Sequence, residues 1–375
     1  MSSGPRVLMV AGEASGDLRG AELIEELRRR VPDLQLSGVG GERLRAAGME
    51  ILVSAEELSI MGITEVFAQA GTILRSYAKI RRAIRGQNGA RPDLVILIDF
   101  PDYNLRLARV AKRVGVPVFY YISPQVWAWR RYRIKTLARR VDRLAVVFPF
   151  EAELFTGLTQ VDFVGHPALE TVRAERSREE VRADLGIPEG KRLVALLPGS
   201  RNAEVASLLP SMLGALEQQD NVAGVIALAG ERLRPAVSEA GGGSLPMVVG
   251  STWDLVAAAD LVLLASGTAT LETALLGTPM VVSYRLSALT YAIVRMLVRV
   301  DHIAMPNLIL ERRAVPELVQ AEVSAERMAA EARAILDDPG RAAAMRADLA
   351  QVRERLGEAG AAGRAAAIAA GMLGL

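Results

Sequence analysis

The sequence predicts an α/β protein with two doubly wound parallel sheets, followed by C-terminal helices. Three observations support this prediction. Short apolar runs rich in β-branched residues alternate with amphipathic helical segments. The runs end at polar or glycine-containing turns, and the whole pattern starts again near residue 168. Because 375 residues exceed one typical core, we expect domains at 1–167 and 168–338, with helices in 339–375 that pack across the domains or onto a partner.

The composition excludes several classes of protein. Hydrophobic residues make up 51% of the chain and the net charge is +2, which argues against disorder and against a nucleic-acid partner. There are no cysteines and only 2 histidines, so disulfides, thiolate sites and histidine-rich metal centres are ruled out. The N-terminal apolar run is too short for a signal peptide, and no window is long enough to span a membrane. We expect a cytoplasmic protein.

The first predicted strand is Arg6 to Ala11, and a loop of residues 12–17 leads into a helix over about 18–31. Strand, glycine loop and helix present backbone N–H groups to an anion at the start of the helix. A tight turn that needs glycine for its backbone conformation, without any bound anion, would explain the same residues equally well. Both interpretations stay open, because the loop lacks the G-x-G-x-x-G pattern of dinucleotide sites.

A second strand at 35–39 precedes an unusual segment, residues 58–74, in which only Glu65 is charged. Its apolar residues have helical spacing, and Arg75, Lys79 and three further arginines follow it by residue 85. This pattern is typical of a helix on an anionic membrane surface. A core helix with a solvated cationic end explains it as well, and the sequence does not decide between the two.

Two neighbouring buried strands, 94–98 and 116–122, both end in polar residues. Ligands of open α/β sheets bind at the carboxyl ends of such strands, so we place the reaction centre here. The polar and aromatic residues that follow the two strands are Asp99, Asp102, Asn104, Ser123, Gln125, Trp127 and Trp129, with Arg130, Arg131, Arg133 and Lys135 beyond them. Further strands at 144–148 and 161–165 complete the first domain.

The second domain repeats the pattern, with strands at 193–197, 222–228, 247–249, 261–264 and 280–283. The first of these ends in Pro198-Gly199-Ser200-Arg201, with Glu204 one turn later. This is no P-loop, but a glycine, a hydroxyl and an arginine at a helix start suit a diphosphate.

Residues 265–272, Ala-Ser-Gly-Thr-Ala-Thr-Leu-Glu, follow another buried strand. Gly267 allows close approach of a phosphate, and Ser266, Thr268 and Thr270 can donate hydrogen bonds to it. Glu272 could accept both hydroxyls of a ribose. A carboxylate favoured by the helix dipole is the alternative for Glu272.

Two consecutive Rossmann-like domains without G-x-G-x-x-G suggest the GT-B glycosyltransferase architecture, in which the two domains face a cleft. The motifs resemble those of one family, the lipid-A-disaccharide synthases of glycosyltransferase family 19. The matching stretches are Gly12–Asp17, Met61–Ile63, Ile98–Asn104, Ser123–Trp129, Gly165–Pro167, Leu197–Arg201 with Glu204, Ala265–Glu272, Met280–Val282, Pro306–Leu308 and Val315–Leu318. Departures are small: Tyr103 stands where phenylalanine is commoner, residues 301–305 match loosely, and the last fifty residues match only in being helical.

The resemblance implies a reaction and its substrates. A 2,3-diacylglucosamine unit passes from UDP to the 6-hydroxyl of 2,3-diacylglucosamine 1-phosphate, giving lipid A disaccharide 1-phosphate and UDP at the cytoplasmic face of the inner membrane. An α-linked donor and a β-linked product imply inversion, which needs one general base. We expect Asp99 to be that base, with Asp102 capping the following helix or contacting the acceptor.

The resemblance also distributes the other roles. Nucleotide binding falls to Gly199, Ser200, Arg201, Glu204, Ser266, Gly267, Thr268, Thr270, Glu272 and Asn307. Acceptor and lipid binding fall to Ser15, Gly16, Asp17, Met61, Phe67, Asp102, Asn104, Ser123, Gln125, Trp127, Trp129, Arg130 and Arg131. No D-x-D motif occurs, so we expect no metal and no cofactor.

Two alternatives stay open at the level of sequence. One is another UDP-sugar GT-B enzyme, such as the peptidoglycan-type glycosyltransferase or the UDP-N-acetylglucosamine 2-epimerase, which would share 266–272 but not 123–129. The other is a non-catalytic nucleotide-sugar or lipid-binding protein, which has no need of a carboxylate at position 99. Peripheral contact with an anionic membrane is expected, and a homodimer stays open.

Overall fold

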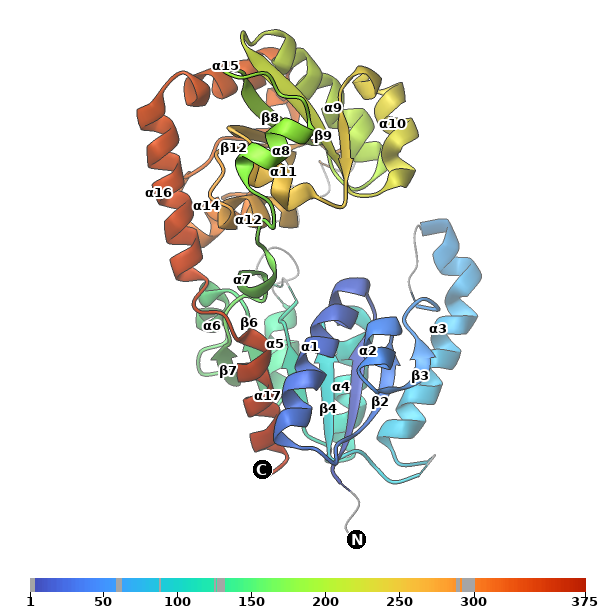
Figure 1. Ribbon diagram of the computed structural model, residues 1–375. Coiled ribbons are helices and arrows are strands. Elements are labelled where there is room, and N and C mark those ends of the chain that lie inside the picture. The colour runs from blue at the N-terminus through green and yellow to red at the C-terminus, as the bar shows by residue number, and fades with distance from the viewer. Residues whose placement is uncertain are drawn as a thin grey trace. The chain divides into compact units, whose positions relative to one another are not determined.

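The computed structural model describes the backbone of residues 4–58, 63–87, 89–124, 126, 132–287, 291 and 301–375. The chain forms two compact units. Unit 1 consists of Met1–Pro167 together with Gly357–Leu375, and unit 2 consists of Ala168–Leu356. The division after residue 167 lies where the sequence pattern starts again. Each unit is a parallel sheet covered by helices (Figure 1).

Unit 1 holds a parallel sheet in the order β3-β2-β1-β4-β5-β6-β7. Its strands are β1 Arg6–Ala11, β2 Gln35–Gly40, β3 Glu50–Ser54, β4 Leu94–Ile98, β5 Val118–Tyr121, β6 Arg143–Val146 and β7 Gln160–Phe163. All five residues of β4 are buried, as expected for a central parallel strand covered on both faces. The edge strand β3 is absent from the predicted strands because its residues are only partly buried and its apolar pattern is correspondingly weak.

The helices of unit 1 are α1 Ala14–Arg30, α2 Glu42–Ala46, α3 Ile63–Ile84, α4 Pro101–Arg113, α5 Arg133–Arg140, α6 Pro149–Leu154 and α17 Ala361–Met372. Helix α1 begins at Ala14 instead of near residue 18, since a turn at Gly12 and Glu13 is enough to leave the strand. In α3 the described residues Ile80 and Ile84 are fully buried against the sheet, whereas Leu74 is 65% exposed. The C-terminal part of α3 therefore packs against the sheet and covers the core.

Unit 2 holds the sheet β10-β9-β8-β11-β12-β13, again parallel throughout. Its strands are β8 Arg192–Leu197, β9 Val222–Leu228, β10 Met247–Val249, β11 Leu261–Ala265, β12 Met280–Tyr284 and β13 Glu317–Val319. The predicted strands agree with β8 to β12 to within one residue. Strand β13 is missing from the prediction because three residues carry too little pattern.

The helices of unit 2 are α7 Ala168–Thr171, α8 Arg178–Asp184, α9 Asn202–Glu217, α10 Arg234–Glu239, α11 Thr252–Ala258, α12 Thr268–Leu275, α14 Met305–Leu310, α15 Ala325–Leu336 and α16 Pro339–Arg355, with short 3-10 turns at Glu231–Leu233, Gly242–Ser244 and Gln320–Glu322. Pro339 and Gly340 are the first two residues of α16. The Asp338 carboxylate accepts hydrogen bonds from the backbone N–H groups of Gly340 (2.8 Å) and Arg341 (3.1 Å) and so caps that helix.

The C-terminal helices differ from the expected third segment at 339–375. Helices α15 and α16 belong to unit 2, and only α17 belongs to unit 1. Helix α17 packs along α1, and its alanines Ala361, Ala365 and Ala369 are fully buried. Arg364 Nε donates to the carbonyl of Val164 over 2.8 Å, which fixes the helix beside the end of β7. The charge-poor final helix therefore completes the core of unit 1.

In each sheet the order in which successive strands are added reverses at one point, the topological switch point. In unit 1 this switch lies between β1 and β4, whose last residues, Ala11 and Ile98, are register partners. In unit 2 it lies between β8 and β11, where Leu197 pairs with Leu264. Ligands of doubly wound folds bind outside the carboxyl ends of the strands at such switch points. Four of the predicted site segments, 12–17, 99–104, 199–204 and 266–272, therefore begin at one of these switch points.

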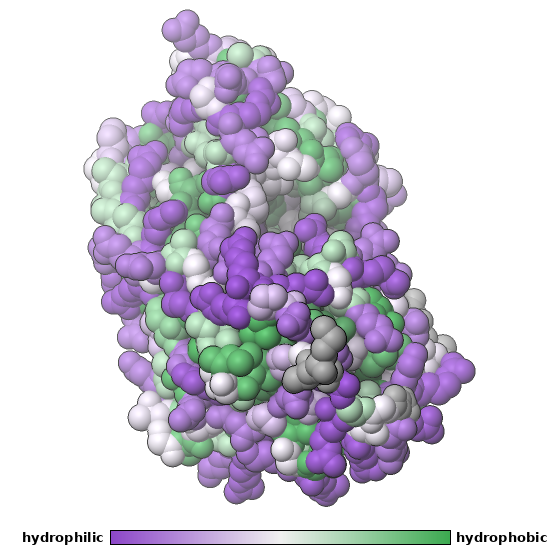
Figure 2. Space-filling view, turned by 60° about the horizontal axis from the view of Figure 1, so that its bottom comes forward, coloured by the Kyte–Doolittle hydropathy of each residue, from purple (hydrophilic) through white to green (hydrophobic). Residues whose placement is uncertain are grey.

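Within the described residues, no helix is long and apolar enough to cross a membrane. The face drawn in Figure 2 is mostly hydrophilic, with hydrophobic side chains in smaller areas between. Among the side chains that the structure describes, the large hydrophobic ones that are exposed are Leu74, Tyr132, Leu158, Phe163, Val249 and Leu375.

Candidate active site

The switch point of unit 1 brings Glu13 and Asp99 together at the ends of β1 and β4. Gly12, between β1 and Glu13, lies against the Phe100 ring: a Cβ at Gly12 would be 2.5 Å from that ring. Burial raises the pKa of the Asp99 carboxyl, and a backbone hydrogen bond at Phe100 offsets part of the effect. Desolvation, and then the charge of Asp99, raises the pKa of Glu13. A carboxylate with a raised pKa at a ligand-binding edge suits proton abstraction.

Glu13 is absent from the residues predicted from sequence. Its position as the N-cap residue of α1 suggests a capping role, but its side chain makes no capping hydrogen bond. The signal that could have found it is the pairing of β1 with β4, which puts the residues after Ala11 beside Asp99.

Asp17 has a structural role that argues against its predicted contact with the acceptor. Its side chain is buried, and its carboxylate accepts hydrogen bonds from the backbone N–H groups of Gly41 (2.6 Å), Arg43 (3.0 Å) and Leu44 (3.3 Å). It therefore caps helix α2 from another element. Of the two neighbouring predicted residues, Ser15 is exposed in the first turn of α1 and Gly16 is buried against the sheet.

Asn104 is fully buried, so it cannot contact the acceptor as predicted. Its Nδ2 atom donates to the carbonyl oxygens of Ile98 (3.1 Å) and Asp99 (2.6 Å). Capping the following helix was one of the two roles expected for Asp102. The N-cap residue of α4 is Phe100 instead. Asp102 instead forms an ion pair with the buried Arg133, and the Asp102 side chain is 70% exposed.

Ser123 is buried and its hydroxyl donates to the carbonyl of Pro124 over 3.2 Å. Six predicted acceptor and lipid residues lie outside the described part of the chain, as does the side chain of Phe67 on α3. The six are Met61, Gln125, Trp127, Trp129, Arg130 and Arg131.

A cavity of about 790 Å³ opens at the switch point of unit 2. Its walls include the ends of β8 and β11 and the first turns of α9, α11 and α12. Predicted nucleotide-binding residues that line it are Gly199, Ser200, Arg201, Glu204, Ser266, Gly267, Thr268 and Glu272. The cavity is of the size that holds small-molecule and cofactor ligands.

Three helices point their N-termini at this cavity, where unpaired backbone N–H groups and the helix dipole favour an anion. Gly267 precedes α12 with a φ of 150°, and a Cβ there would have no neighbour within 4 Å. Open space directly above a helix start leaves room for a phosphate to approach the backbone.

At the start of α9, Glu204 folds back over the loop. Its carboxylate accepts hydrogen bonds from the backbone N–H groups of Ser200 (2.8 Å) and Arg201 (3.2 Å), and it pairs with the Arg201 guanidinium at 3.0 Å. Gly199 has a φ of 119°, and a Cβ there would lie 2.4 Å from the Glu204 carboxylate. Glu204 thus shapes the loop, and the Arg201 guanidinium, although paired with Glu204, is 79% exposed at the cavity where a diphosphate could meet it.

Two predicted nucleotide-binding residues are internal supports. Thr270 is fully buried; its hydroxyl donates to the Gly267 carbonyl (2.7 Å) and accepts from the backbone N–H of Met305 (3.2 Å). Asn307 is fully buried, and its amide bonds the backbone of Ala314 and Val315 and the carboxylate of Glu317. Neither residue lines the cavity: Thr270 supports the turn at Gly267 beside it, whereas Asn307 ties α14 to the segment that leads into β13.

Trp253 is a cavity residue that the sequence patterns above do not single out. It lies in the first turn of α11, and its Nε1 atom donates to Glu272 Oε2 over 3.1 Å. The available signal is its place in Gly250-Ser-Thr-Trp253, just after the short strand β10. This hydrogen bond fixes one oxygen of Glu272 and leaves the other for a ligand hydroxyl.

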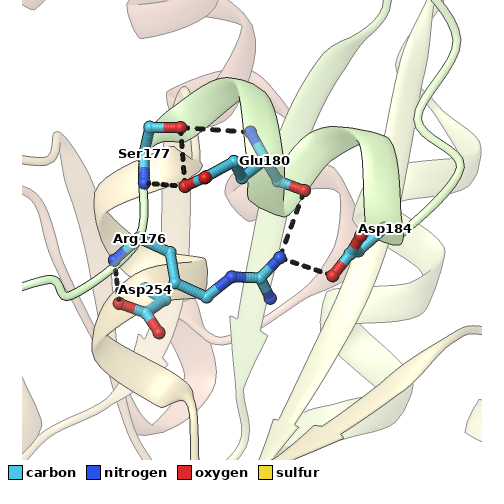
Figure 3. A network of polar contacts seen from close by, with 5 residues as sticks. All are labelled: Arg176, Ser177, Glu180, Asp184 and Asp254. Carbon is cyan, nitrogen blue, oxygen red and sulfur yellow. Dashed lines mark hydrogen bonds and ion pairs between the residues drawn. The ribbon is translucent and has the colours of Figure 1, made fainter.

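A polar network holds the remaining wall of the cavity in place (Figure 3). Asp254 Oδ1, on α11, accepts hydrogen bonds from the backbone N–H groups of Glu175 (2.7 Å) and Arg176 (3.2 Å). Ser177 caps α8 in a reciprocal pair with Glu180, and Arg176 forms an ion pair with Asp184. Since Arg173, Glu175 and Asp254 line the cavity, this network ties its edge to α8 and α11.

In the described part of the chain, no group of three or more His, Asp or Glu side chains is arranged to hold a metal ion.

Comparison with known proteins identifies relatives over the whole chain. A sequence model of the family described as lipid-A-disaccharide synthetase matches residues 7–371. The lipid-A-disaccharide synthase of Geobacter sulfurreducens is 45% identical over 378 residues, covering 98% of this chain and 97% of that protein. The one from Myxococcus xanthus is 42% identical over 374 residues, covering 98% and 97%.

Solved structures with the same fold are more distant in sequence. The S. aureus MnaA–UDP co-structure superposes with a TM-score of 0.65 at 12% identity, covering 96% of this chain and 94% of that one. The Anabaena Alr3699/HepE complex with UDP and glucose gives a TM-score of 0.58 at 14% identity, covering 99% and 100%. The similar structures confirm the GT-B fold class with its two Rossmann-like domains.

Proposed function

The chain belongs to the lipid-A-disaccharide synthase family of glycosyltransferases, and from this premise we infer that it transfers 2,3-diacylglucosamine from UDP to the 6-hydroxyl of 2,3-diacylglucosamine 1-phosphate. Membership means synthesis of a lipid A disaccharide by glycosyl transfer. The two acylated substrates and the inverting course are our proposal. The observation that carries it is the carboxylate of Asp99, held at the switch point of unit 1 with a raised pKa.

In the proposed reaction the 6-hydroxyl oxygen of the acceptor attacks C1 of the donor sugar. The bond from C1 to the diphosphate oxygen breaks in the same step, and Asp99 takes the hydroxyl proton. The α-linked donor becomes a β-linked product because the attack is in line with the leaving group. A general base in this position contributes about 10²–10⁴-fold to the rate.

UDP is proposed to occupy the cavity of unit 2. The N–H groups ahead of α12, together with Arg201, meet the charge that develops on the leaving diphosphate. Glu272 accepts a ribose hydroxyl. This electrostatic arrangement needs no metal ion, and turnover that survives EDTA treatment is the expected result; loss of turnover that Mg²⁺ restores would overturn this part.

The enzyme is proposed to work at the cytoplasmic face of the inner membrane, where its acylated substrates reside. Support comes from α3, on which Leu74 is 65% exposed and Arg75 and Arg82 are also exposed. Sedimentation with anionic vesicles tests this. The double variant Leu74→Glu, Arg75→Glu should bind them less well, whereas Leu158→Glu, at another exposed leucine, should not; equal binding by both would contradict the proposal.

The decisive experiment incubates the protein with both acylated substrates and follows UDP and disaccharide by mass spectrometry, with NMR to assign the new linkage. We expect equimolar products and a β-1,6 bond. No disaccharide would refute the proposed function. The Asp99→Asn variant should lose about 10²–10⁴ in kcat while UDP still binds, and near-normal turnover would remove Asp99 as base.

A further inference from the structure

Asp99 and Phe100 form an unusual turn between β4 and α4. Each has a φ of 47°, in the left-handed region that non-glycine residues rarely adopt. Six described non-glycine residues have positive φ, and these two are the only consecutive ones among them. Such a conformation is strained for a non-glycine residue and persists only where neighbours hold it.

Two buried side chains hold the carbonyl groups of this turn. Asn104 Nδ2, on α4, donates to the carbonyl oxygens of both Ile98 and Asp99. The Tyr120 hydroxyl, on the adjacent strand β5, donates to the same Asp99 carbonyl. Both side chains are fully buried, so these hydrogen bonds are shielded from competing water and hold the turn from two elements.

The Phe100 ring closes the turn on its other side. It packs on Gly12 and on the Tyr103 ring, whose centroid is 5.4 Å away. The backbone N–H of Asn104 donates to the Phe100 carbonyl over 3.0 Å, which starts α4 directly from the strained turn. With the backbone of Asp99 fixed at its carbonyl and at the next residue, the direction of its side chain is determined by its neighbours.

We propose that Asn104 and Tyr120 are positioning residues for the transfer, which aim the Asp99 carboxylate by locking the Asp99–Phe100 turn in the left-handed conformation. This inference rests on the proposed role of Asp99 as the base. It gives Asn104 a function other than the acceptor contact expected from sequence, and it adds Tyr120, which no motif singles out.

The test uses Tyr120→Phe and Asn104→Leu, which remove the donors while nearly preserving volume. We expect kcat to fall about 10-fold in the first and toward 10²-fold in the second, because an ångström of misplacement can cost that much. The KM of both substrates and the affinity for UDP should stay within about twofold. Tyr103→Phe is the matched control: its hydroxyl is also buried but makes no hydrogen bond among the described residues, so kcat should not change.

Asp99→Asn separates this inference from the proposed function. If Asp99→Asn keeps full turnover, the base assignment fails. If Asp99→Asn is impaired, Tyr120→Phe added to it should cost little more, since Tyr120 acts through Asp99. A further 10-fold loss in the double variant, or an unchanged kcat in well-folded Tyr120→Phe and Asn104→Leu, would overturn the positioning role alone.

Discussion

Trp253 Nε1 donates a hydrogen bond to Glu272 Oε2 over 3.1 Å and so joins helices α11 and α12 at the wall of one cavity. Because one carboxylate oxygen of Glu272 is held by Trp253, the position of its other oxygen is fixed as well. Glu272 is therefore held in one orientation, which would lower the entropy cost of the ribose contact proposed for it.

The Trp253→Phe variant tests this relationship. It keeps an aromatic ring but removes the donor, so Glu272 becomes free to rotate. We expect the affinity for UDP, measured by calorimetry, to fall about tenfold, since a hydrogen bond to a charged group contributes about 1.5–3 kcal/mol. In the Glu272→Gln background the same change should have a smaller effect, because the two residues act together. Strictly additive losses would show that Trp253 contributes without Glu272.

The Gly267→Ala variant tests the phosphate site proposed at the start of α12. The backbone φ of Gly267 is 150°, a conformation that is strained for any residue with a side chain. The new methyl group would project into the open space of the cavity. We expect UDP to bind at least tenfold more weakly. The control is Gly277→Ala at the other end of α12, where φ is 73° and space is likewise open. It should lower stability by a similar amount but leave UDP affinity unchanged; weakened UDP binding in both variants would mean that strain alone is responsible.

The sequence predicts the sheets and the switch-point segments well, because buried parallel strands have long apolar runs and sharp polar ends. It predicts burial of individual polar residues poorly. Asn104, Thr270 and Asn307 stand in motifs beside residues that are predicted to bind ligands, yet their side chains turn inward to hold backbone groups. A motif records which residues a site needs, but only the packing shows which of them touch the ligand.

The same limit explains Glu13 and Trp253. Their positions become informative only through strand order and through the approach of α11 to α12, both of which depend on residues far apart in the chain. Edge strands such as β3 are missed for a related reason, because an edge strand with partly buried residues has no continuous apolar run.

The Asp17→Ala variant tests the capping role of a residue expected to contact the acceptor. It leaves the N–H groups of Gly41, Arg43 and Leu44 without their acceptor. We expect the free energy of unfolding of unit 1, measured by urea denaturation, to fall by about 1–2 kcal/mol, with the KM for the acceptor unchanged. Asp33→Ala, at an exposed turn after α1, is the control and should be near neutral. A raised acceptor KM at unchanged stability would instead favour the acceptor contact.

The pH dependence of turnover follows from the raised pKa of Asp99, whose first cause is burial. A base must be unprotonated, so kcat/KM should fall as the pH drops through that pKa, above the range usual for an aspartate. The pH profile of kcat/KM is measured in buffers of constant ionic strength without Mg²⁺, so that only the pH varies. An acid limb within the ordinary aspartate range would contradict the burial of the base.

Stability should change in the opposite direction with pH. Because the pKa of Asp99 is higher in the folded chain than in the unfolded chain, its contribution to stability is fully present below the unfolded pKa and is lost as the pH rises through the folded pKa. Asp99→Asn removes this partly buried charge. Its Tm should therefore exceed that of the unaltered protein at pH 8, and the difference should shrink as the pH falls. Glu57→Gln, at an exposed position, should show no such trend, and a Tm gain in Asp99→Asn that does not vary with pH would refute the linkage.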